Sequence, residues 1–550
     1  MSGNSRDSDY CRSQGFEGEC RLASSDSCAT LPTNRPEGAT MPSTTLGELL
    51  ERRAAQRPDA EAAVFPDGAT TYAELAERAR RFARGLAGLG VGKGDRVGIL
   101  LPASADLLAA LIGATRIGAI AVPVNARFKA VELGGIVSHS GMRVLVTEGR
   151  EPELPDAPEL EHVVVLGRDE LPDADLPDIT TTPSDTAVIV YTSGTTAAPK
   201  GAMLPHSALT GLAAGIVERM QLTADDRVWT AIPLFHGGGL TFAFSCLTAG
   251  APFVHPGHFD PSTTLEYLTE QRVTVALAAF ETIWMPVLDR PDFAGFDLSR
   301  IRVVMAVGVP ERLRDMASRL PQAVHVSCVA MTESSAFLTL NRLDDPADAR
   351  ATTGGHPMPG MQCRVVDPGT GRDQPPGTPG ELLFRGPNAF TGYFRDPEHT
   401  ASVIDADGWF HSGDLVVADD DGRLTFRSRL KDMLKVGGEN VAAAEVEDHL
   451  LHHPAVAVVA VVAAPDARYV EVPAAYVQLR ENARASEKEL IDFCLGRIAT
   501  YRVPRYVRFV DGPADWPMSG TKIKKYVLRE RIAAELQAAG ITEAPKPVVA

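Results

Sequence analysis

Short apolar runs alternate with stretches of helical spacing from Thr71 onward, and this alternation constrains the fold more than any other feature of the chain. The helical stretches are residues 72–89 and 107–117. The apolar runs with strand character are residues 97–101, 119–124, 144–147, 163–166 and 187–191. Strands that are joined through helices form parallel sheets with helices on both faces. The pattern therefore predicts an α/β fold.

A change of composition near residues 427–435 indicates a boundary between domains, because this strongly charged stretch lies between two apolar ones. With 550 residues the chain is long enough for several lobes, each with its own core. Beyond the boundary we expect a helix, a strand, a second helix and a basic segment, at residues 443–451, 456–462, 487–498 and 522–531. This order predicts a small α+β domain that is joined to the rest through a hinge.

The first 41 residues are rich in Ser, Asp, Arg and Gly and show little apolar periodicity, so we expect them to be disordered. Met41 is followed at once by a helical pattern from Leu46 to Ala54. Met41 is therefore a candidate start of the native chain, with a dispensable extension before it. A regulatory tail is the alternative interpretation of the same residues.

The net charge of −17 excludes nonspecific nucleic-acid binding, which needs a cationic surface. Four of the seven cysteines lie far apart without metal-ligand spacing, and three fall in the first thirty residues, a pattern that suits a reducing cytoplasm. The apolar run at residues 455–464 is too short for a transmembrane segment and reads as a buried strand. The N-terminus lacks the apolar core that signal peptides need. These features predict a cytoplasmic protein without a transmembrane segment.

A loop rich in hydroxyl groups follows the strand that ends near Tyr191, and it reads Tyr191-Thr-Ser-Gly-Thr-Thr-Ala-Ala-Pro-Lys200-Gly201. Hydroxyls and backbone N–H groups that converge at the end of a strand suit a polyphosphate. The residues that provide these groups are Thr192, Ser193, Gly194, Thr195 and Thr196. Lys200 adds a cation at the end of the loop, although the Gly-Lys-Ser/Thr ending of a Walker loop is absent. We predict a phosphate-binding loop, and an ordinary polar turn is the alternative.

Further motifs follow this loop in a fixed order. They are Pro233-Leu-Phe-His236-Gly237, Met331-Thr332-Glu333, Gly380-Glu381-Leu with Gly392-Tyr393, Trp409-Phe-His-Ser-Gly-Asp414, Arg429-Leu-Lys431-Asp432 through Gly437-Gly438-Glu439-Asn440, and Trp516-Pro-Met-Ser-Gly-Thr-Lys522-Ile523. With these motifs the chain resembles the adenylate-forming superfamily of acyl-CoA synthetases, luciferases and nonribosomal adenylation domains. The resemblance covers residues 45–535.

The resemblance implies an α/β architecture with two domains of unequal size. A large N-terminal domain of stacked, helix-covered mixed and parallel β-sheets with a β-barrel-like lobe would carry the acyl and ATP sites, and a small, mobile α+β domain would act as a lid. The implied boundaries are an extension at 1–41, the adenylation domain at 42–428, a hinge at 429–433, the lid domain at 434–540 and a disordered tail at 541–550.

The resemblance also implies an ATP-dependent ligase that activates a carboxylic acid as acyl-AMP, releases pyrophosphate and forms the acyl-CoA thioester. ATP, Mg²⁺ and coenzyme A would be its cofactors. Lys522 would bridge the carboxylate and the α-phosphate, while Thr332 would contact phosphate and Glu333 would hold Mg²⁺. Asp414 would accept both ribose hydroxyls, and Arg429 would bind ribose or phosphate through its forked donors.

The remaining roles that the resemblance implies concern the two pockets and the hinge. His236 would be a catalytic gate between the acyl and nucleotide pockets, next to pocket residues Gly237, Gly308 and Val309. Lys200 and Lys522 would be the other catalytic residues. Val329 and Met331 would lie beside the nucleotide, Lys431 would be the hinge residue, and Gly437, Gly438 and Glu439 would line the path of coenzyme A.

At four places the sequence departs from the usual pattern of this superfamily. Ala197 and Thr521 stand where glycine is usual, and Val329-Ala330 replaces an aromatic residue and glycine. Val307-Gly308-Val309 replaces two glycines and alanine, which narrows the expected acyl pocket. Because a ring stacked on a base contributes about 1–3 kcal/mol, we expect Val329 to weaken ATP binding.

The resemblance leaves the acid and the acceptor open. The segment from Phe235 to Gly239 offers no acidic side chain for a substrate ammonium, which favours a simple carboxylate. A medium or longer fatty acid is the first expectation and an aryl acid the second. The alternative functions are a stand-alone enzyme that loads a carrier protein and an inactive homologue that only binds nucleotide or acyl groups. Both a monomer and a homodimer remain open.

Overall fold

The computed structural model describes residues 44–545 except 129, 150, 151, 153, 155, 156, 193–199, 431, 432, 437, 438, 520 and 521. For residues 131, 192, 282, 435, 439, 440, 519 and 522 it describes the backbone only. The predictions for residues 1–41, for most of the phosphate loop and for the hinge residue Lys431 therefore lie outside the described residues.

The described chain begins with helix α1 (Leu46–Gln56), which confirms the helical pattern read from the sequence. Thr45 caps this helix, because its hydroxyl accepts from the N–H of Glu48 while the Glu48 carboxylate accepts from the N–H of Thr45. The apolar face with Leu46, Leu49 and Leu50 is buried against α2 and α3. This packing fixes the helix on the first core.

The first sheet runs in the order β6-β5-β3-β4-β7-β8 and is parallel except for the β7–β8 pair. Its strands are β3 (Arg96–Leu100), β4 (Ile120–Pro123), β5 (Val144–Glu148), β6 (His162–Leu166), β7 (Thr186–Thr192) and β8 (Lys200–Pro205). The helices of this region are α2 (Tyr72–Gly88), α3 (Ala105–Arg116) and α4 (Ala130–Ser140). The strands and the two helices predicted from the alternation are confirmed to within about two residues.

A second sheet runs in the order β13-β12-β11-β9-β10-β1-β2 and is parallel except for the β1–β2 pair. Its strands are β1 (Glu61–Phe65), β2 (Gly68–Thr71), β9 (Val228–Thr230), β10 (Phe253–Val254), β11 (Val275–Phe280), β12 (Val303–Val307) and β13 (Val324–Val326). Its helices are α5 (His206–Met220), α6 (Gly237–Ala249), α7 (Pro261–Glu270), α8 (Glu281–Leu288), η1 (Phe293–Gly295) and α9 (Pro310–Arg319).

Helices lie between these two sheets and join them into one core. Helix α3 contacts β3 and β4 of the first sheet and β1 of the second, while α6 contacts β9 and β10. The buried residues of both sheets belong to the same apolar cluster, which includes Ile99, Leu111, Phe242 and Phe253. The helices on the outer faces pack against smaller clusters. The mixed and parallel sheets with helices on both faces confirm the predicted fold class.

Antiparallel strands connect this core to the C-terminal part of the chain. One sheet contains β14 (Cys328–Met331), β15 (Ala336–Leu340) and β16 (His356–Pro357), and another contains β17 (Gln362–Val366), β18 (Gly380–Arg385), β19 (Phe410–Ala418) and β20 (Leu424–Arg429). The helical turns of this region are η2 (Thr332–Ser334), α10 (Ala347–Thr352) and α11 (Pro397–Val403). The β17–β20 sheet is an open antiparallel sheet of four strands, and the β-barrel-like lobe that the resemblance implied stays a prediction.

The C-terminal lobe has its own cores around a mainly antiparallel sheet in the order β22-β21-β24-β23, with β25 parallel to β24. Its strands are β21 (Met433–Val436), β22 (Glu439–Ala442), β23 (Val456–Asp466), β24 (Val470–Leu479), β25 (Tyr506–Phe509), β26 (Met518–Ser519) and β27 (Lys522–Ile523). Its helices are α12 (Ala443–Leu451), α13 (Glu487–Cys494), η4 (Pro513–Asp515) and α14 (Lys525–Ala538). The predicted α+β composition of this segment is confirmed.

Two predicted boundaries in this lobe were wrong. The strand predicted at 456–462 continues to Asp466, because it pairs along its whole length with β24 in a long hairpin. The helix predicted at 487–498 ends at Cys494, where Leu495 is extended and Gly496 has a φ of 72°. A left-handed glycine is a common way to end a helix.

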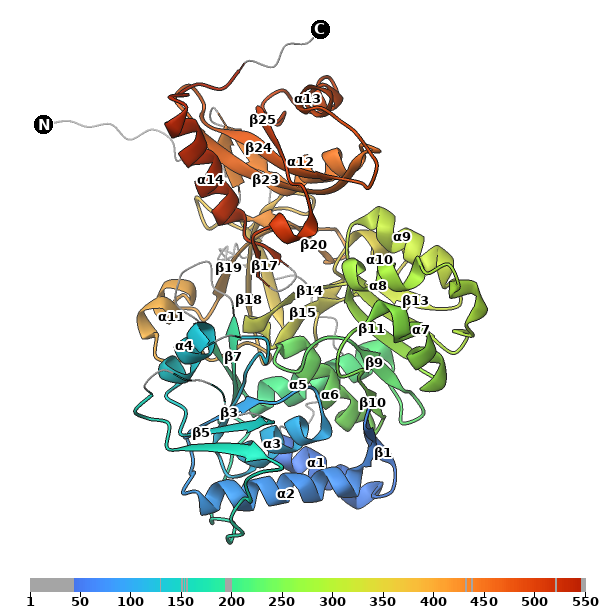
Figure 1. Cartoon of the computed structure of the whole chain (residues 1–550), viewed down its shortest axis with the longest axis vertical. Coiled ribbons are helices and arrows are strands. Elements are labelled where there is room, and N and C mark those ends of the chain that lie inside the picture. The colour runs from blue at the N-terminus through green and yellow to red at the C-terminus, as the bar shows by residue number, and fades with distance from the viewer. Residues whose placement is uncertain are drawn as a thin grey trace, which may run out of the picture.

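Figure 1 shows the C-terminal lobe at one end of the molecule, beyond β17–β20, and helices α1–α3 at the opposite end. The sheet with β19 and β20 therefore lies at the junction between the large α/β body and the C-terminal lobe. In the described part of the chain, no helix has the length and apolar character that crossing a membrane requires.

Candidate active site

Several predicted site residues follow strands of the second sheet at its carboxyl edge. Strands β9, β11 and β12 are parallel neighbours, and Phe280 of β11 pairs with Val307 of β12. His236 lies in the connection after β9, while Gly308 and Val309 come directly after β12. Ligands of open α/β sheets bind outside the carboxyl ends of the strands. The topology thus brings the predicted acyl-pocket residues to one edge.

His236 and Gly237 begin helix α6, and contacts to the β14–β15 connection fix this end of the helix. The ring centroids of Phe235 and His236 are 4.5 Å apart. The hydroxyl of Thr241 donates to the backbone carbonyl of Ser335 at 2.9 Å. The predicted gate histidine therefore lies on the helix that packs against the Thr332–Glu333 turn.

Glu281 is a further candidate at this edge, and it was not predicted from the sequence. It is the first residue of α8 directly after β11, and its Oε2 accepts from the backbone N–H of Val309 at 2.8 Å. Its Oε1 lies 3.5 Å from Nε of Arg312, and the side chain is 15% exposed. Burial raises the pKa of Glu281 above its usual value. The sequence signal was a carboxylate immediately after an apolar run of strand character.

Gly308 is needed beside this carboxylate, because a Cβ at position 308 would overlap Oε2 of Glu281. Phe280, which precedes Glu281, is 40% exposed and places an aromatic side chain at the same edge. The predicted pocket residues Gly308 and Val309 thus share their surroundings with an acidic and an aromatic side chain.

The Thr332–Glu333 turn adopts a constrained backbone. It forms η2, and the two residues after it, Ser335 and Ala336, have positive φ values of 60° and 127°. Non-glycine residues in such conformations cost free energy and cluster at functional sites. Oε1 of Glu333 accepts a 2.7 Å hydrogen bond from the hydroxyl of Tyr393. Burial, followed by the charge of Glu333, raises the pKa of Tyr393, so the phenol stays protonated and donates.

Glu333 fits a Mg²⁺ ion that arrives with a nucleotide. Mg²⁺ is usually bound through one or two carboxylates together with phosphate oxygens and water. Among the residues that the structure describes, no group of three or more His, Cys, Asp or Glu side chains could form a metal site by itself. A single carboxylate beside a phosphate site is the donor set expected for such an ion.

Lys200 begins strand β8 and lies close to the partner of Glu333. Its Nζ is 2.9 Å from Nε2 of His399 and 5.8 Å from the ring centroid of Tyr393. The rings of Tyr393 and His399 are stacked with centroids 4.7 Å apart. The structure thus gathers Lys200 and Glu333 around one pair of rings. The backbone of Thr192 pairs with Lys200, whereas residues 193–196 lie outside the described chain.

Asp414 and Arg429 occupy opposing positions on β19 and β20. Oδ1 of Asp414 is 2.5 Å from Nε of Arg429, and the aspartate residue is 3% exposed. The N–H of Asp414 donates to the hydroxyl of Ser412 at 3.0 Å. The two residues predicted to hold ribose therefore form one ion pair at the junction with the C-terminal lobe.

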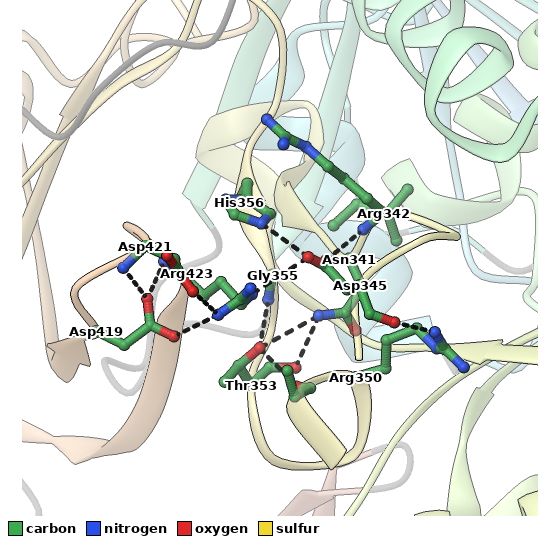
Figure 2. A network of polar contacts seen from close by, with 12 residues as sticks. Asn341, Arg342, Asp345, Arg350, Thr353, Gly355, His356, Asp419, Asp421 and Arg423 are labelled. Atoms are coloured by element: carbon green, nitrogen blue, oxygen red, sulfur yellow. Dashed lines mark hydrogen bonds and ion pairs between the residues drawn. The ribbon is translucent and has the colours of Figure 1, made fainter. Parts of the chain in front are cut away.

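A buried polar network fixes the β19–β20 hairpin on the body of the protein (Figure 2). Oδ1 of Asp345 lies 3.1 Å from Nε2 of His356 and 3.3 Å from Nε of Arg423. Arg423 also pairs with Asp419 and Asp421 in the hairpin. Backbone hydrogen bonds join Leu424 to Gly354 and Gly355. Because β20 carries Arg429, this network fixes the position of the Asp414–Arg429 ion pair relative to β14.

Val329 and Met331 both lie on β14, but they differ in exposure. Val329 is 6% exposed, and its N–H donates to the Thr339 hydroxyl at 3.0 Å. Ala330 is exposed and Met331 is partly buried. The side chain of Val329 therefore packs into the core, as part of the apolar cluster shared by the two main sheets.

The structure describes the C-terminal candidates only in part. Lys522 lies in β27, which pairs with β26, but its side chain is outside the described atoms. Glu439 begins β22, whereas Lys431, Gly437 and Gly438 are not described. No described contact brings these residues to Lys200, Glu333 or Asp414.

Two segments of the chain match models of known protein families. Residues 50–394 match the model of the AMP-binding enzyme family, and residues 445–517 match the model of the AMP-binding enzyme C-terminal domain. The first match spans more than half of the chain.

The similar proteins align with most of this chain and with nearly their own whole length. A feruloyl-CoA synthase from Amycolatopsis is 36% identical, with 88% of this chain and 99% of the relative covered. A long-chain-fatty-acid–CoA ligase of Mycobacterium tuberculosis is 31% identical, with 89% and 99% covered. The solved o-succinylbenzoate CoA synthetase of Bacillus subtilis, in complex with its acyl-adenylate intermediate, has a TM-score of 0.79 at 26% identity and covers 92% of this chain and 100% of that one.

Proposed function

The chain belongs to the AMP-binding enzyme family, as an acid–thiol ligase that joins carboxylic acids to coenzyme A with ATP, and we propose that its acid is a fatty acid. Adenylation brings a carboxylate to the α-phosphate of ATP, so two anions must approach each other. Catalysis of such a step rests on positioning and on electrostatic stabilisation of the developing charge. The proposed site residues provide both.

The observation that carries this proposal is the convergence of Lys200 and Glu333 on Tyr393 and His399. In the proposed site Lys200 binds phosphate oxygens of ATP. Glu333 would hold Mg²⁺, and the bound ion would neutralise phosphate charge. Asp414 accepts the ribose hydroxyls, while the contact with Arg429 holds the buried carboxylate in position.

The C-terminal lobe completes the proposed site. Lys522 bridges the carboxylate and the α-phosphate during adenylation, and rotation about Lys431 then withdraws it. The loop with Gly437, Gly438 and Glu439 replaces it and guides coenzyme A. The place of β19 and β20 next to this lobe supports a rotation at that junction (Figure 1). We place the hinge at residues 429–433, between the adenylation domain at 42–428 and the lid domain at 434–540, as the motifs predict them.

Apolar side chains at the carboxyl edge support a fatty acid. Phe235, Phe280 and Val309 lie at this edge, and Phe280 is 40% exposed. Both oxygens of Glu281 already face partners, the N–H of Val309 and the guanidinium of Arg312. An aryl acid is the second candidate, because a feruloyl-CoA synthase is among the similar proteins.

The proposed location of the protein is the cytoplasm. Four free, buried cysteines agree with it, namely Cys246, Cys328, Cys363 and Cys494.

The test is pyrophosphate release from Mg·ATP with a panel of octanoate, palmitate, ferulate, benzoate and acetate, followed by thioester formation with coenzyme A. We expect the highest kcat/KM with octanoate or palmitate. A higher value with ferulate would assign the second candidate. Acyl-AMP formation without transfer to coenzyme A would indicate a carrier-protein acceptor, and no pyrophosphate from any acid would overturn the proposal.

A further inference from the structure

His399 is the closest described partner of Lys200, although the two residues are far apart in the sequence. Strand β8, which begins at Lys200, is flanked on its outer side by residues 391–394. The N–H of Met203 donates to the carbonyl of Gly392 at 3.0 Å, and the N–H of Phe394 donates to the carbonyl of Gly201 at 2.8 Å. This pairing brings helix α11, with His399, to the side of β8.

The geometry settles which group donates between these two residues. A lysine ammonium has three donors and no acceptor, so Nε2 of His399 must accept and its ring proton must lie on Nδ1. Nδ1 lies 3.3 Å from the hydroxyl of Ser402, which can accept this proton. His399 is therefore a neutral acceptor for the Lys200 ammonium.

Tyr393 holds the imidazole ring of His399 in place. The two rings are stacked with an interplanar angle of 19°, and the N–H of Tyr393 donates to the Thr400 hydroxyl at 2.9 Å. The N–H of His399 itself donates to Asp396 at 3.1 Å. Since Tyr393 also donates to Glu333, the orientation of Lys200 is coupled to that of the candidate magnesium carboxylate.

We propose that His399 is a positioning residue for Lys200, which it orients toward the ATP phosphates without neutralising its charge. A free lysine side chain loses rotamer entropy when it is held in one orientation. A carboxylate partner would also restrain it, but would cancel the charge that the phosphates need. A neutral imidazole and the face of Tyr393 restrain the ammonium and leave two of its donors for phosphate oxygens.

This inference rests on the proposed adenylation, since Lys200 would bind phosphate groups of ATP that are absent from acyl-AMP. His399→Phe keeps a ring to stack on Tyr393 and removes the acceptor, whereas His399→Gln keeps an acceptor and removes the ring. We expect His399→Phe to raise KM for ATP and Kd for Mg-pyrophosphate about 3- to 10-fold, the effect of losing one ordinary hydrogen bond that orients Lys200 but does not itself touch phosphate. His399→Gln should lose less.

Three measurements separate positioning from a structural role. Thioester formation from synthetic acyl-AMP should not change in His399→Phe. In a Lys200→Met background the same substitution should have no further effect on Kd for Mg-pyrophosphate, because its partner is gone. The matched control is His452→Phe, because His452 is an exposed histidine in the C-terminal lobe. This variant should bind Mg-pyrophosphate like the wild type.

Additive effects of His399→Phe and Lys200→Met, or equal losses in both half-reactions, would overturn the inference. Unchanged Kd and KM in His399→Phe would also overturn it. If the wild type releases no pyrophosphate from any acid, the proposed function fails, while calorimetry with Mg-pyrophosphate still tests the role of His399. If His399→Phe folds poorly, the comparison of His399→Gln with the wild type, alone and with Lys200→Met, serves as the same test.

Discussion

Asp414 on β19 and Arg429 on β20 face each other across an antiparallel pair, with Oδ1 and Nε 2.5 Å apart. The aspartate is almost fully buried, whereas the arginine side chain is 42% exposed. Removing the cation would take a charged partner from a buried carboxylate, which is more costly than losing an exposed ion pair. The pair therefore presents the Asp414 carboxylate to a ligand from a fixed position.

The first prediction concerns this pair. Arg429→Met should raise KM for ATP by about 10- to 100-fold, since a charge-assisted contact contributes about 1.5–3 kcal/mol. Steady-state pyrophosphate release at saturating acid measures it. The control is Lys488→Met, which removes an ion pair with Asp492 from a side chain that is 78% exposed. A KM that stays at the wild-type value would mean that the pair does not contact the nucleotide.

The second prediction concerns division of labour between the half-reactions. Lys522→Ala should slow adenylation roughly 10²- to 10³-fold, the scale for one preorganised contact to the transition state. Thioester formation from synthetic acyl-AMP should change far less, because the lysine leaves the site before that step in the proposed rotation. Single-turnover rates of both steps provide the measurement. Equal losses in both steps would contradict a rotating C-terminal lobe.

The third prediction concerns the buried network in Figure 2. Burial by itself would raise the pKa of Asp345, but the N–H of Arg342, together with His356 and Arg423, lowers it below the usual value. Asp345→Asn removes the carboxylate shared by His356 and Arg423, while Arg423 keeps its pairs with Asp419 and Asp421, and should destabilise the protein by about 1–3 kcal/mol at pH 7. Thermal unfolding measures this difference.

The pH dependence of the same variant has a definite sign. A carboxyl with a lowered pKa in the folded state stabilises the protein above its unfolded pKa, and this contribution is lost as the pH falls through the folded value. The difference in melting temperature between wild type and Asp345→Asn should therefore shrink below about pH 4, near the ordinary pKa of aspartate. A difference that is constant from pH 7 to pH 3 would assign the effect to packing.

The elements of the fold could be predicted from local patterns, whereas the contacts of the site could not. Strand β5 and helix α2 are visible as apolar runs and helical spacing because each is determined by neighbouring residues. Lys200 and His399 touch only because residues 391–394 pair with β8, a relation that no local pattern contains. Tyr393 was noted in a motif, yet its hydrogen bond to Glu333 depends on the same long-range pairing. Glu281 was missed because its burial depends on β12, the next strand of the sheet.

The fourth prediction concerns Glu281. Burial raises its pKa in the folded state, so the native protein holds this proton more tightly than the unfolded chain. Stability from this group is then greatest at low pH and falls as the pH rises through the folded value. Glu281→Gln keeps an acceptor for the N–H of Val309 and removes the buried charge.

We therefore expect Glu281→Gln to be at least as stable as the wild type at pH 8, with the difference in melting temperature disappearing near pH 4. The control is Glu530→Gln, an exposed position on α14, which should show no such trend. A Glu281→Gln variant that is several degrees less stable at pH 8 would show that the ion pair with Arg312 outweighs the cost of burial.

The last prediction concerns Val329, which stands where the resemblance to the adenylate-forming superfamily implies an aromatic ring. A stacked ring contributes about 1–3 kcal/mol, so Val329→Tyr would lower KM for ATP by roughly 5- to 100-fold if the ring reached adenine. The structure argues for the opposite result. Val329 is 6% exposed, and Gly354 lies so close to it that a Cβ at position 354 would overlap the valine side chain.

The Thr339 hydroxyl, which donates to the carbonyl of Gly354 at 2.6 Å, holds this contact in place. An added ring must therefore displace core atoms, and overpacking of this kind typically costs about 1–3 kcal/mol. We expect Val329→Tyr to unfold at a lower temperature without any improvement in KM, and Val329→Ile to show a smaller loss of the same kind. An unchanged melting temperature together with a KM lowered at least 5-fold would show that the ring turns out of the core and stacks on the base.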